Sequence, residues 1–443
     1  MTIQLSEHFT YKKLLRFTFP TIVMMIFTSI YSVVDGIFVS NFVGKTAFAA
    51  VNLIMPFLIF TGTIGFMLGT GGSALVAKTL GEGDKNRANK YFSMTVYAGI
   101  AGGVILAVLG IVFARPVAFL LGADNEMLDY CTLYARIILV ALPAFVLQNI
   151  FQSFLVTAEK PKLGLFLTVL AGVTNMVLDL LFVGIFKWGI TGAAVATGIS
   201  QAVGGVIPLV YFLRPNSSAL SLVRTKINSR TLLRVCVNGS SEMLSNISLS
   251  VVNMLYNYQL MRLAGENGVA AYGAIMYINF IFVGVYFGYA VGAAPIIGYH
   301  YGAQNHDEMK SLFKKSVVLL TVWGVLMTVL AVLLAPPLSG IFVGYDAELF
   351  ALTNRGFKIY ALSFLLMGYN IFASAFFTAL NNGAVSAAIS FLRTLVFQIV
   401  PVMTLPLLFG SDGIWFSVVA AEIMSIAVSV FFVARNRNKY HYI

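Results

Sequence analysis

Charged residues are scarce in this chain of 443 residues, where Asp, Glu, Lys and Arg together make up only 10%. Soluble domains usually carry about 25% charged residues, so this composition excludes an ordinary soluble protein. Hydrophobic residues make up 59%, and the mean hydropathy is +0.88. The composition is typical of a protein that crosses the membrane many times.

Cysteine and histidine are also rare. Cys131 and Cys236, the only cysteines, fall near opposite ends of different apolar segments, so we expect no disulfide. The four histidines lie outside the apolar segments or at their ends, which argues against a zinc site inside the membrane. The sequence contains no Walker A motif, so ATP is not the expected energy source. No catalytic constellation indicates an enzyme, and we expect no cofactor beyond a coupling ion.

What the chain does contain is an internal repeat at a spacing of 221 residues. The matched positions include Gly71 and Gly292, Gly81 and Gly302, and the tripeptides Asn149–Phe151 and Asn370–Phe372. One register that holds over more than a hundred residues is not explained by composition. A repeat in an apolar chain predicts a transporter of two related lobes that handle substrate between them.

Twelve segments are long and apolar enough to span a membrane, which needs about 20 residues each. Basic residues mark their sidedness, because 20 of the 28 fall in the even-numbered loops and termini and 6 on the other side. This bias predicts a plasma-membrane protein with both termini in the cytoplasm, and it explains the net charge of +11 without nucleic acid. The predicted spans are 14–40, 48–77, 91–114, 127–156, 163–186, 190–213, 231–261, 269–299, 311–335, 350–380, 384–408 and 412–434.

The spans divide into two lobes of six helices each. We expect an N-lobe of residues 1–213, a cytoplasmic linker loop of residues 214–230 and a C-lobe of residues 231–443. With six spans each, both halves enter from the same side, so a pseudo-two-fold axis along the membrane normal relates them. The predicted fold class is therefore an all-α polytopic membrane protein, and we expect a monomer.

Acidic side chains inside the membrane are costly and are candidates for function. Counting along the helices places Asp35 about 8 Å, and Asp179 about 10 Å, from the outer ends of their spans. Asn175, Thr197 and Tyr134 fall near the same depth. Such oxygen atoms could hold Na⁺, or the two acids could share a proton, since both do not ionise comfortably in a low dielectric. A purely structural role in joining helices is the alternative.

The second half contains a different charged set. Glu242, Arg393 and Glu422 all fall near mid-membrane, and we expect Arg393 to form a structural ion pair with Glu422, Glu242 or both. Glu242 is also a candidate for coupling or substrate contact. In the first span, Pro20 predicts a helix bend, either fixed or coupled to a change at Asp35.

Together these features resemble the multidrug and toxic compound extrusion (MATE) family over essentially the whole chain, nearest its bacterial MepA-type branch. The resemblance rests on Pro20 and Asp35 on the first span, Asn175 and Asp179 on the fifth, and Thr197 on the sixth. The resemblance implies drug export by alternating access, driven by re-entry of Na⁺ or H⁺. Glu242 resembles the acid that many members carry on the seventh span. Some members carry an acid on the tenth span, where this chain has Asn370, which weakens the case for a second cation site.

The charges inside the membrane also indicate the cargo. Asp35, Asp179, Glu242 and Glu422 outnumber Arg136 and Arg393 by two, which favours lipophilic cationic drugs or dyes. The alternative is a flippase for a lipid-linked or amphiphilic precursor, which could share the two-lobe fold. A pyrophosphate-bearing cargo would require several Arg or Lys side chains in the cavity, so the cationic cargo is preferred.

Overall fold

The structure is a computed structural model that describes residues 3–38, 42–43 and 45–443, with the side chains of residues 32, 33, 35–38, 45, 48 and 125 outside the description. Helices make up all the regular structure of these residues. The first half contains α1 (Tyr11–Phe38), α2 (Lys45–Gly81), α3 (Lys85–Leu120), α4 (Asn125–Val140), α5 (Leu142–Thr157), α6 (Pro161–Asp179), the π-helical segment η2 (Leu180–Ile185) and α7 (Gly189–Leu213). The second half contains α8 (Ser229–Gly302), α9 (His306–Val343), α10 (Ala347–Ala361), α11 (Phe364–Ala379), α12 (Gly383–Phe391), η3 (Leu392–Val396), α13 (Phe397–Phe409) and α14 (Ser411–Tyr440).

The helices account for twelve membrane spans. Within the described residues, nine helices are long and apolar enough to cross a membrane, and two bent pairs bring the number to eleven. The twelfth comes from α8, whose 74 residues include Gly265 in a non-helical conformation with φ of 59°. A straight helix of that length would measure about 110 Å, far more than a bilayer core, so α8 is two spans that meet at Gly265.

Two spans that the sequence predicts as continuous are broken. α4 and α5 meet at an angle of 55°, and α10 and α11 meet at 52°. Pro143 stands at the start of α5, where its missing N–H is tolerated. The equivalent position at the start of α11 is Phe364, so the second break has no proline to reveal it. The two breaks occupy equivalent places in the two halves.

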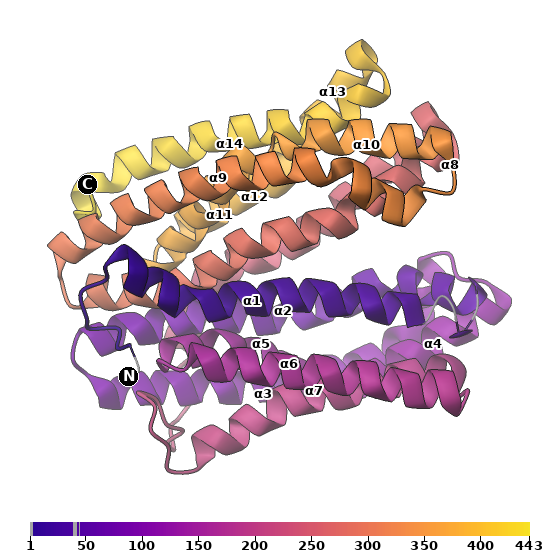
Figure 1. Cartoon of the computed structure of the whole chain (residues 1–443). Helices are drawn as coiled ribbons and strands as arrows, with labels where there is room; N and C mark the ends of the chain where they lie inside the picture. Colours follow the sequence, from indigo (N-terminus) through magenta and orange to yellow (C-terminus); the bar gives the residue numbers. More distant parts are fainter. Residues whose placement is uncertain (1–2, 39–41, 44) are drawn as a thin grey trace.

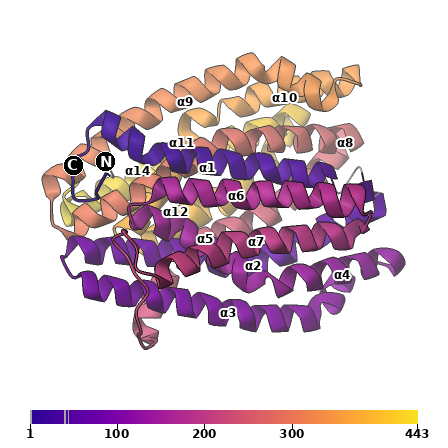
Figure 2. The same cartoon turned by 60° about the horizontal axis from the view of Figure 1, so that its bottom comes forward.

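The helices of each half pack together as one lobe. Figure 1 shows α1–α7 as the lower lobe and α8–α14 as the upper one, and Figure 2 brings the lower lobe forward with part of the upper lobe behind it. α1 and α2 form the boundary, where both pack along α8. The predicted all-α fold with two lobes of membrane-spanning helices is confirmed.

The contact between the lobes follows the internal repeat. A Cβ atom built at Gly81 would lie 1.9 Å from the carbonyl oxygen of Tyr299, and one built at Gly302 would lie 1.9 Å from that of Lys78. Both residues of the second contact are separated from their counterparts in the first by 221 positions. The two lobes thus touch backbone to backbone about a pseudo-two-fold axis. Only glycine permits this approach.

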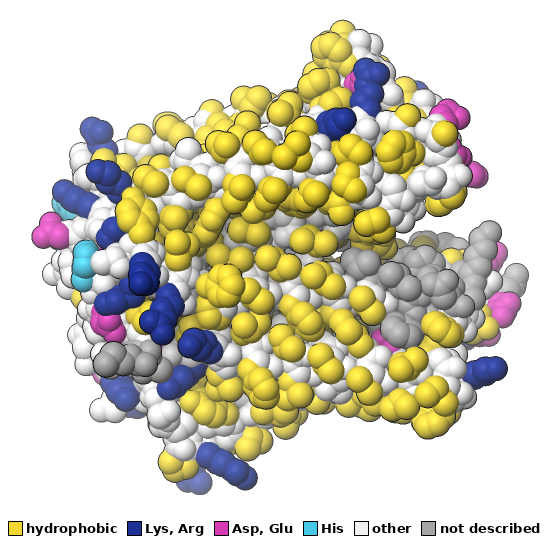
Figure 3. All heavy atoms as spheres, viewed as in Figure 1, with side chains coloured by type: hydrophobic (Ala, Val, Ile, Leu, Met, Phe, Trp, Pro, Cys, Tyr) yellow, Lys and Arg dark blue, Asp and Glu magenta, His cyan; other side chains and the backbone are white. Residues whose placement is uncertain are grey.

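The two ends of the molecule differ. We call the end that carries both chain termini, with Lys12, Lys85, Lys310 and Arg435, the basic end, and the opposite end the open end. In Figure 3 most Lys and Arg side chains of the visible face gather at the basic end, next to a broad hydrophobic band. The same view shows the surface hollowed between the lobes at the open end. The glycine contacts at residues 81 and 302 close the basic end.

Candidate functional site

Three of the predicted polar residues of the first lobe, Asn175, Asp179 and Thr197, lie on α6 and α7, which pack side by side. The amide nitrogen of Asn175 lies 3.5 Å from the hydroxyl oxygen of Thr197, and the hydroxyl of Ser200 donates to the carbonyl of Ala171 at 2.9 Å. The antiparallel register of these contacts fixes which residues face each other. It brings together two of the four residues predicted to bind a cation.

α1 approaches α6 just below this contact. A Cβ atom at Gly172 would lie 2.5 Å from the ring of Phe27 and 3.3 Å from that of Tyr31, so the glycine lets the two helices come close. Both helices run toward the open end. At about 1.5 Å per residue, the backbone of Asp35, one turn beyond Tyr31, is level with Asn175, one turn beyond Gly172. The side chain of Asp35 lies outside the described residues.

The remaining predicted residues of this lobe are deeply buried. Asp179 is 0% exposed, Asn175 is 2% exposed and Tyr134, on α4, is 1% exposed. A carboxylate removed from water is costly unless it is protonated or interacts with a cation or hydrogen-bond donors. The buried carboxyl of Asp179, with Asn175 one turn away on α6, therefore has the chemistry to hold either a proton or a small hard cation. Pro20, where the sequence predicts a helix bend, lies inside α1, and α1 continues as one helix through it.

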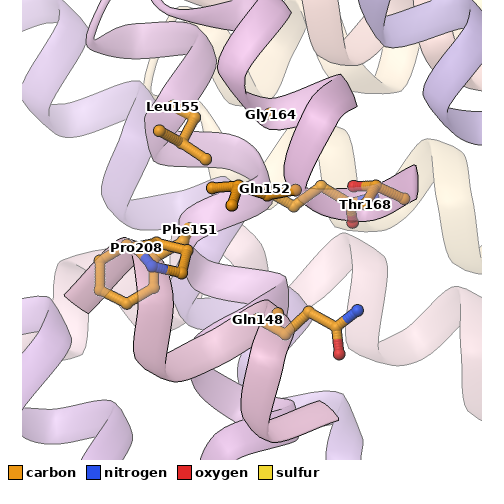
Figure 4. Close-up of a pocket in the computed structure, with 9 residues that line it drawn as sticks. Gln148, Phe151, Gln152, Leu155, Gly164, Thr168 and Pro208 are labelled. Carbon is orange, nitrogen blue, oxygen red and sulfur yellow. The ribbon is translucent and has the colours of Figure 1, made fainter. Parts of the chain in front are cut away.

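Two amides that the sequence-based predictions miss line a small pocket toward the basic end of the same lobe. Gln148 and Gln152 of α5 lie there with Thr168 of α6, as Figure 4 shows. The side-chain oxygens of Gln148 and of Gln201, one turn from Thr197, are buried without a hydrogen bond. Such oxygens usually bind ordered water. The sequence signal that could have revealed this pocket is the pair of amides at positions 148 and 152, four residues apart in an apolar span.

The second lobe contains a fully assembled ion pair. The Nη2 atom of Arg393 lies 2.8 Å from Glu422 Oε1, and its Nε atom also donates to the same carboxylate at 3.0 Å. Asn370 donates to Glu422 Oε2 at 2.7 Å and accepts from Ser429 at 2.9 Å. Glu422, on α14, is therefore held from α11 and η3 at once. Asn370 is part of this network.

Glu242 lies apart from that network. It is half-buried on α8, with no hydrogen bond to its carboxylate among the described side chains, although the charge of Arg393 acts on it. Farther along α8, the buried Tyr256 stacks on Tyr272 at 5.3 Å and donates to Gln398 at 2.8 Å. Of Glu242 and Glu422, only Glu422 is held by an ion pair within the described part of the chain.

The ion pair leads to a stability prediction. Arg393→Met leaves the carboxylate of Glu422, which is only 1% exposed, without its cation. Removing one partner of a buried pair costs about 3–5 kcal/mol. The double variant Arg393→Met, Glu422→Gln keeps an acceptor for Asn370 and removes the buried charge. We therefore expect a large drop in thermal stability in detergent for the single variant and a clearly smaller one for the double variant. Equal stability of the two would contradict a structural pair.

Comparison with known proteins supports this arrangement of two similar halves. The model of the MatE family matches the chain twice, over residues 20–181 and 243–404. The two matches begin 223 residues apart, close to the spacing of the internal repeat. Each match covers most of one lobe. Together the two matches include Pro20, Asp35, Asn175 and Arg393.

Individual relatives match almost the whole chain. The multidrug export protein MepA of Staphylococcus saprophyticus subsp. saprophyticus is 24% identical over 93% of this chain and 91% of its own length. The MepA of Staphylococcus haemolyticus is 24% identical over 98% of this chain and 95% of its own. A solved structure described as the outward-facing conformation of a multidrug resistance MATE family transporter of the MOP superfamily superposes with a TM-score of 0.93. It is 22% identical and covers 100% of this chain and 99% of that one.

Proposed function

Because this chain belongs to the MatE family, we propose that it is a secondary active exporter that moves drug-like compounds out of the cell by alternating access. The observation that carries the proposal is the pair of lobes closed at the basic end and hollowed at the open end. The family consists of transporters, and the chain is not an enzyme. Relatives that match it over nearly its whole length are named multidrug export proteins, so the flippase alternative is not favoured.

We propose that the coupling ion, H⁺ or Na⁺, binds in the first lobe at Asp35, Asn175, Asp179 and Thr197, with Tyr134 beside them. The contact between Asn175 and Thr197 and the complete burial of Asp179 support this site. Binding there changes the charge next to α1, and a bend at Pro20 is the proposed response. Glu242 is the proposed contact for a cationic cargo, since Glu422 is already neutralised by Arg393.

The two neutral side chains distinguish the ions. Asn175→Ala and Thr197→Ala remove oxygen atoms that a sodium ion would need as ligands, whereas a proton needs only a carboxylate. If Na⁺ couples export, we expect either change to raise the sodium concentration that half-saturates transport by about tenfold or more, which corresponds to a loss of about 1.4 kcal/mol of binding free energy. If H⁺ couples export, the dependence on proton gradient stays close to that of the unchanged protein. Ser200→Ala, one turn away on α7, is the matched control.

The proposed cargo is a lipophilic cation. Expression in cells that lack their own efflux pumps should lower the accumulation of an ethidium-like dye relative to the same cells with an empty vector. Glu242→Gln should reduce this effect for cationic dyes more than for neutral ones. If dye levels stay unchanged while a lipid-linked intermediate changes sides of the membrane, the flippase reading replaces this proposal.

We further propose an orientation in the plasma membrane with the basic end in the cytoplasm, and lobes bounded by residues 1–213 and 231–443. The concentration of Lys and Arg at that end supports it. Single cysteines at Asn216, in the linker, and at Gly344, after α9, should react with a membrane-impermeant reagent from opposite sides in a background without Cys131 and Cys236. Labelling of both from the same side would contradict the orientation and the twelve-span order. The protein is proposed to act as a monomer.

A further inference from the structure

The segment before α1, residues 3–10, crosses the basic end and contacts both lobes; we call it the N-terminal strap. In Figure 1 it leaves the start of α1 on the side of the upper lobe and runs to the N label beside the lower one. Its apolar side chains do not face water: Leu5 is 1% exposed and Phe9 is 0% exposed. Both belong to the hydrophobic cluster formed mainly by the second lobe.

The strap is tied to the second lobe by polar contacts at the start of α9. The backbone N–H of Phe9 donates to Glu308 Oε1 at 2.9 Å, and the ring of His8 lies 2.6 Å from Glu308 Oε2. The ammonium group of Lys315 donates to the carbonyl oxygen of Phe9. The ring of Phe9 also packs edge to face on His300, at the end of α8, with centroids 6.4 Å apart. Glu308 is itself buried, so these are strong, charge-assisted bonds.

The other end of the strap is tied to the first lobe. The backbone N–H of Leu5 donates to Glu159 Oε1 at 2.8 Å. Glu159 lies in the tight turn between α5 and α6, with a positive φ of 61°. Burial raises the pKa of this carboxyl, as expected for an acid covered by the strap. Within the strap, Glu7 accepts from the N–H of Gln4 at 2.9 Å and pairs with Lys13 at 2.6 Å, which holds its shape.

We propose that the N-terminal strap is a latch that stabilises the state closed at the basic end. Glu159 belongs to one lobe, and Glu308 and Lys315 belong to the other. When the lobes separate at this end, the strap cannot keep both sets of bonds. Opening toward the cytoplasm therefore requires its release at one side. Of the non-covalent attachments, the single bond to Glu159 is the weaker, because the opposite side combines a buried phenyl ring with three polar contacts.

The latch can be tested by the distance between the lobes in the full-length protein. Spin labels at Asn86 and Lys310, both exposed at the basic end and on different lobes, would report it in lipid nanodiscs, in a background without Cys131 and Cys236. Phe9→Ala removes the anchor in the second lobe, and Glu159→Ala removes the acceptor in the first. We expect Glu159→Ala to increase the population with a long distance by about tenfold, as for the loss of a charge-assisted hydrogen bond. Phe9→Ala keeps the backbone bonds to Glu308 and Lys315 but should increase the same population, because it removes a buried ring.

Two matched controls separate a latch from a general structural effect. Glu159→Gln keeps an oxygen that can accept from Leu5, and Gln4→Ala changes an exposed side chain that makes no bond in the strap. Gln4→Ala should leave the distance distribution unchanged, and Glu159→Gln, which keeps a neutral acceptor, should change it much less than Glu159→Ala. If Phe9→Ala does not fold, the pair Glu159→Ala and Glu159→Gln still decides the matter. Identical distributions for these two variants would overturn the proposal, whatever ion or cargo the transporter uses.

Discussion

Gradient-driven export is expected to fall to the level of protein-free liposomes when Asp35 and Asp179 are both replaced by asparagine. Among the four residues of the proposed coupling site, only these two can change charge when an ion binds. Asparagine keeps the size of the side chain, so the fold should survive and the loss should be functional. Transport under an imposed H⁺ or Na⁺ gradient, measured for protein of unchanged thermal stability, is the readout. Each single variant should lose most of the activity.

A control variant changes an acid elsewhere in the membrane and tests whether the loss of export is specific to Asp35 and Asp179. Glu422→Gln together with Arg393→Met removes the other completely buried acid without leaving an unpaired charge. This variant should retain gradient-driven export if it folds. Full activity of the Asp35→Asn, Asp179→Asn variant would remove the coupling site from the first lobe.

A single methyl group at the lobe contact is expected to shift the conformational equilibrium. The Cβ of Gly302→Ala would lie 1.9 Å from the carbonyl oxygen of Lys78 and 3.0 Å from its Cα atom, and backbone atoms cannot rotate away. Overpacking of this kind costs roughly 1–3 kcal/mol. Because this cost arises only in the state that is closed at the basic end, the substitution would shift the population toward the open form about 5- to 150-fold. The distance between labels at Asn86 and Lys310 would measure the shift.

The internal repeat supplies a second test of the same contact. Gly81→Ala places its Cβ 1.9 Å from the carbonyl oxygen of Tyr299, so it should act in the same direction and with similar size. Gly273→Ala is the control, because a Cβ there meets nothing within 4 Å. A distance distribution that responds equally to Gly273→Ala and Gly302→Ala would show that helix composition, and not the lobe contact, causes the shift.

The spans were predictable because each must present about 20 apolar residues to the bilayer. The same reasoning could not find the bends. Pro143 marks the break between α4 and α5, but Phe364 occupies the equivalent place before α11, and a bend there depends on packing between helices. Gly265, at the turn in α8, lies 221 residues after Gly44, but this match between two glycines gives no indication of a turn.

The first-lobe site illustrates the same limit. Helical rise alone brings Asn175 and Thr197 to one depth, and the structure places them in contact. The pairing of Arg393 with Glu422 was foreseeable from charge, but the part of Asn370 in that network depends on how α11 packs against α14. The N-terminal strap had no sequence signal, because His8 meets Glu308 across 300 residues of chain. Contacts of that range arise only when both lobes are assembled.

The most direct measurement of the central claim is transport of a lipophilic cationic dye by the purified protein in liposomes under an imposed H⁺ or Na⁺ gradient and without ATP. Cation-coupled multidrug export predicts dye movement opposite to the ion, which stops when the gradient is dissipated and is absent from the Asp35→Asn, Asp179→Asn variant. Dye movement that is unaffected by either gradient, or no dye movement by protein that translocates a lipid-linked precursor, would contradict it.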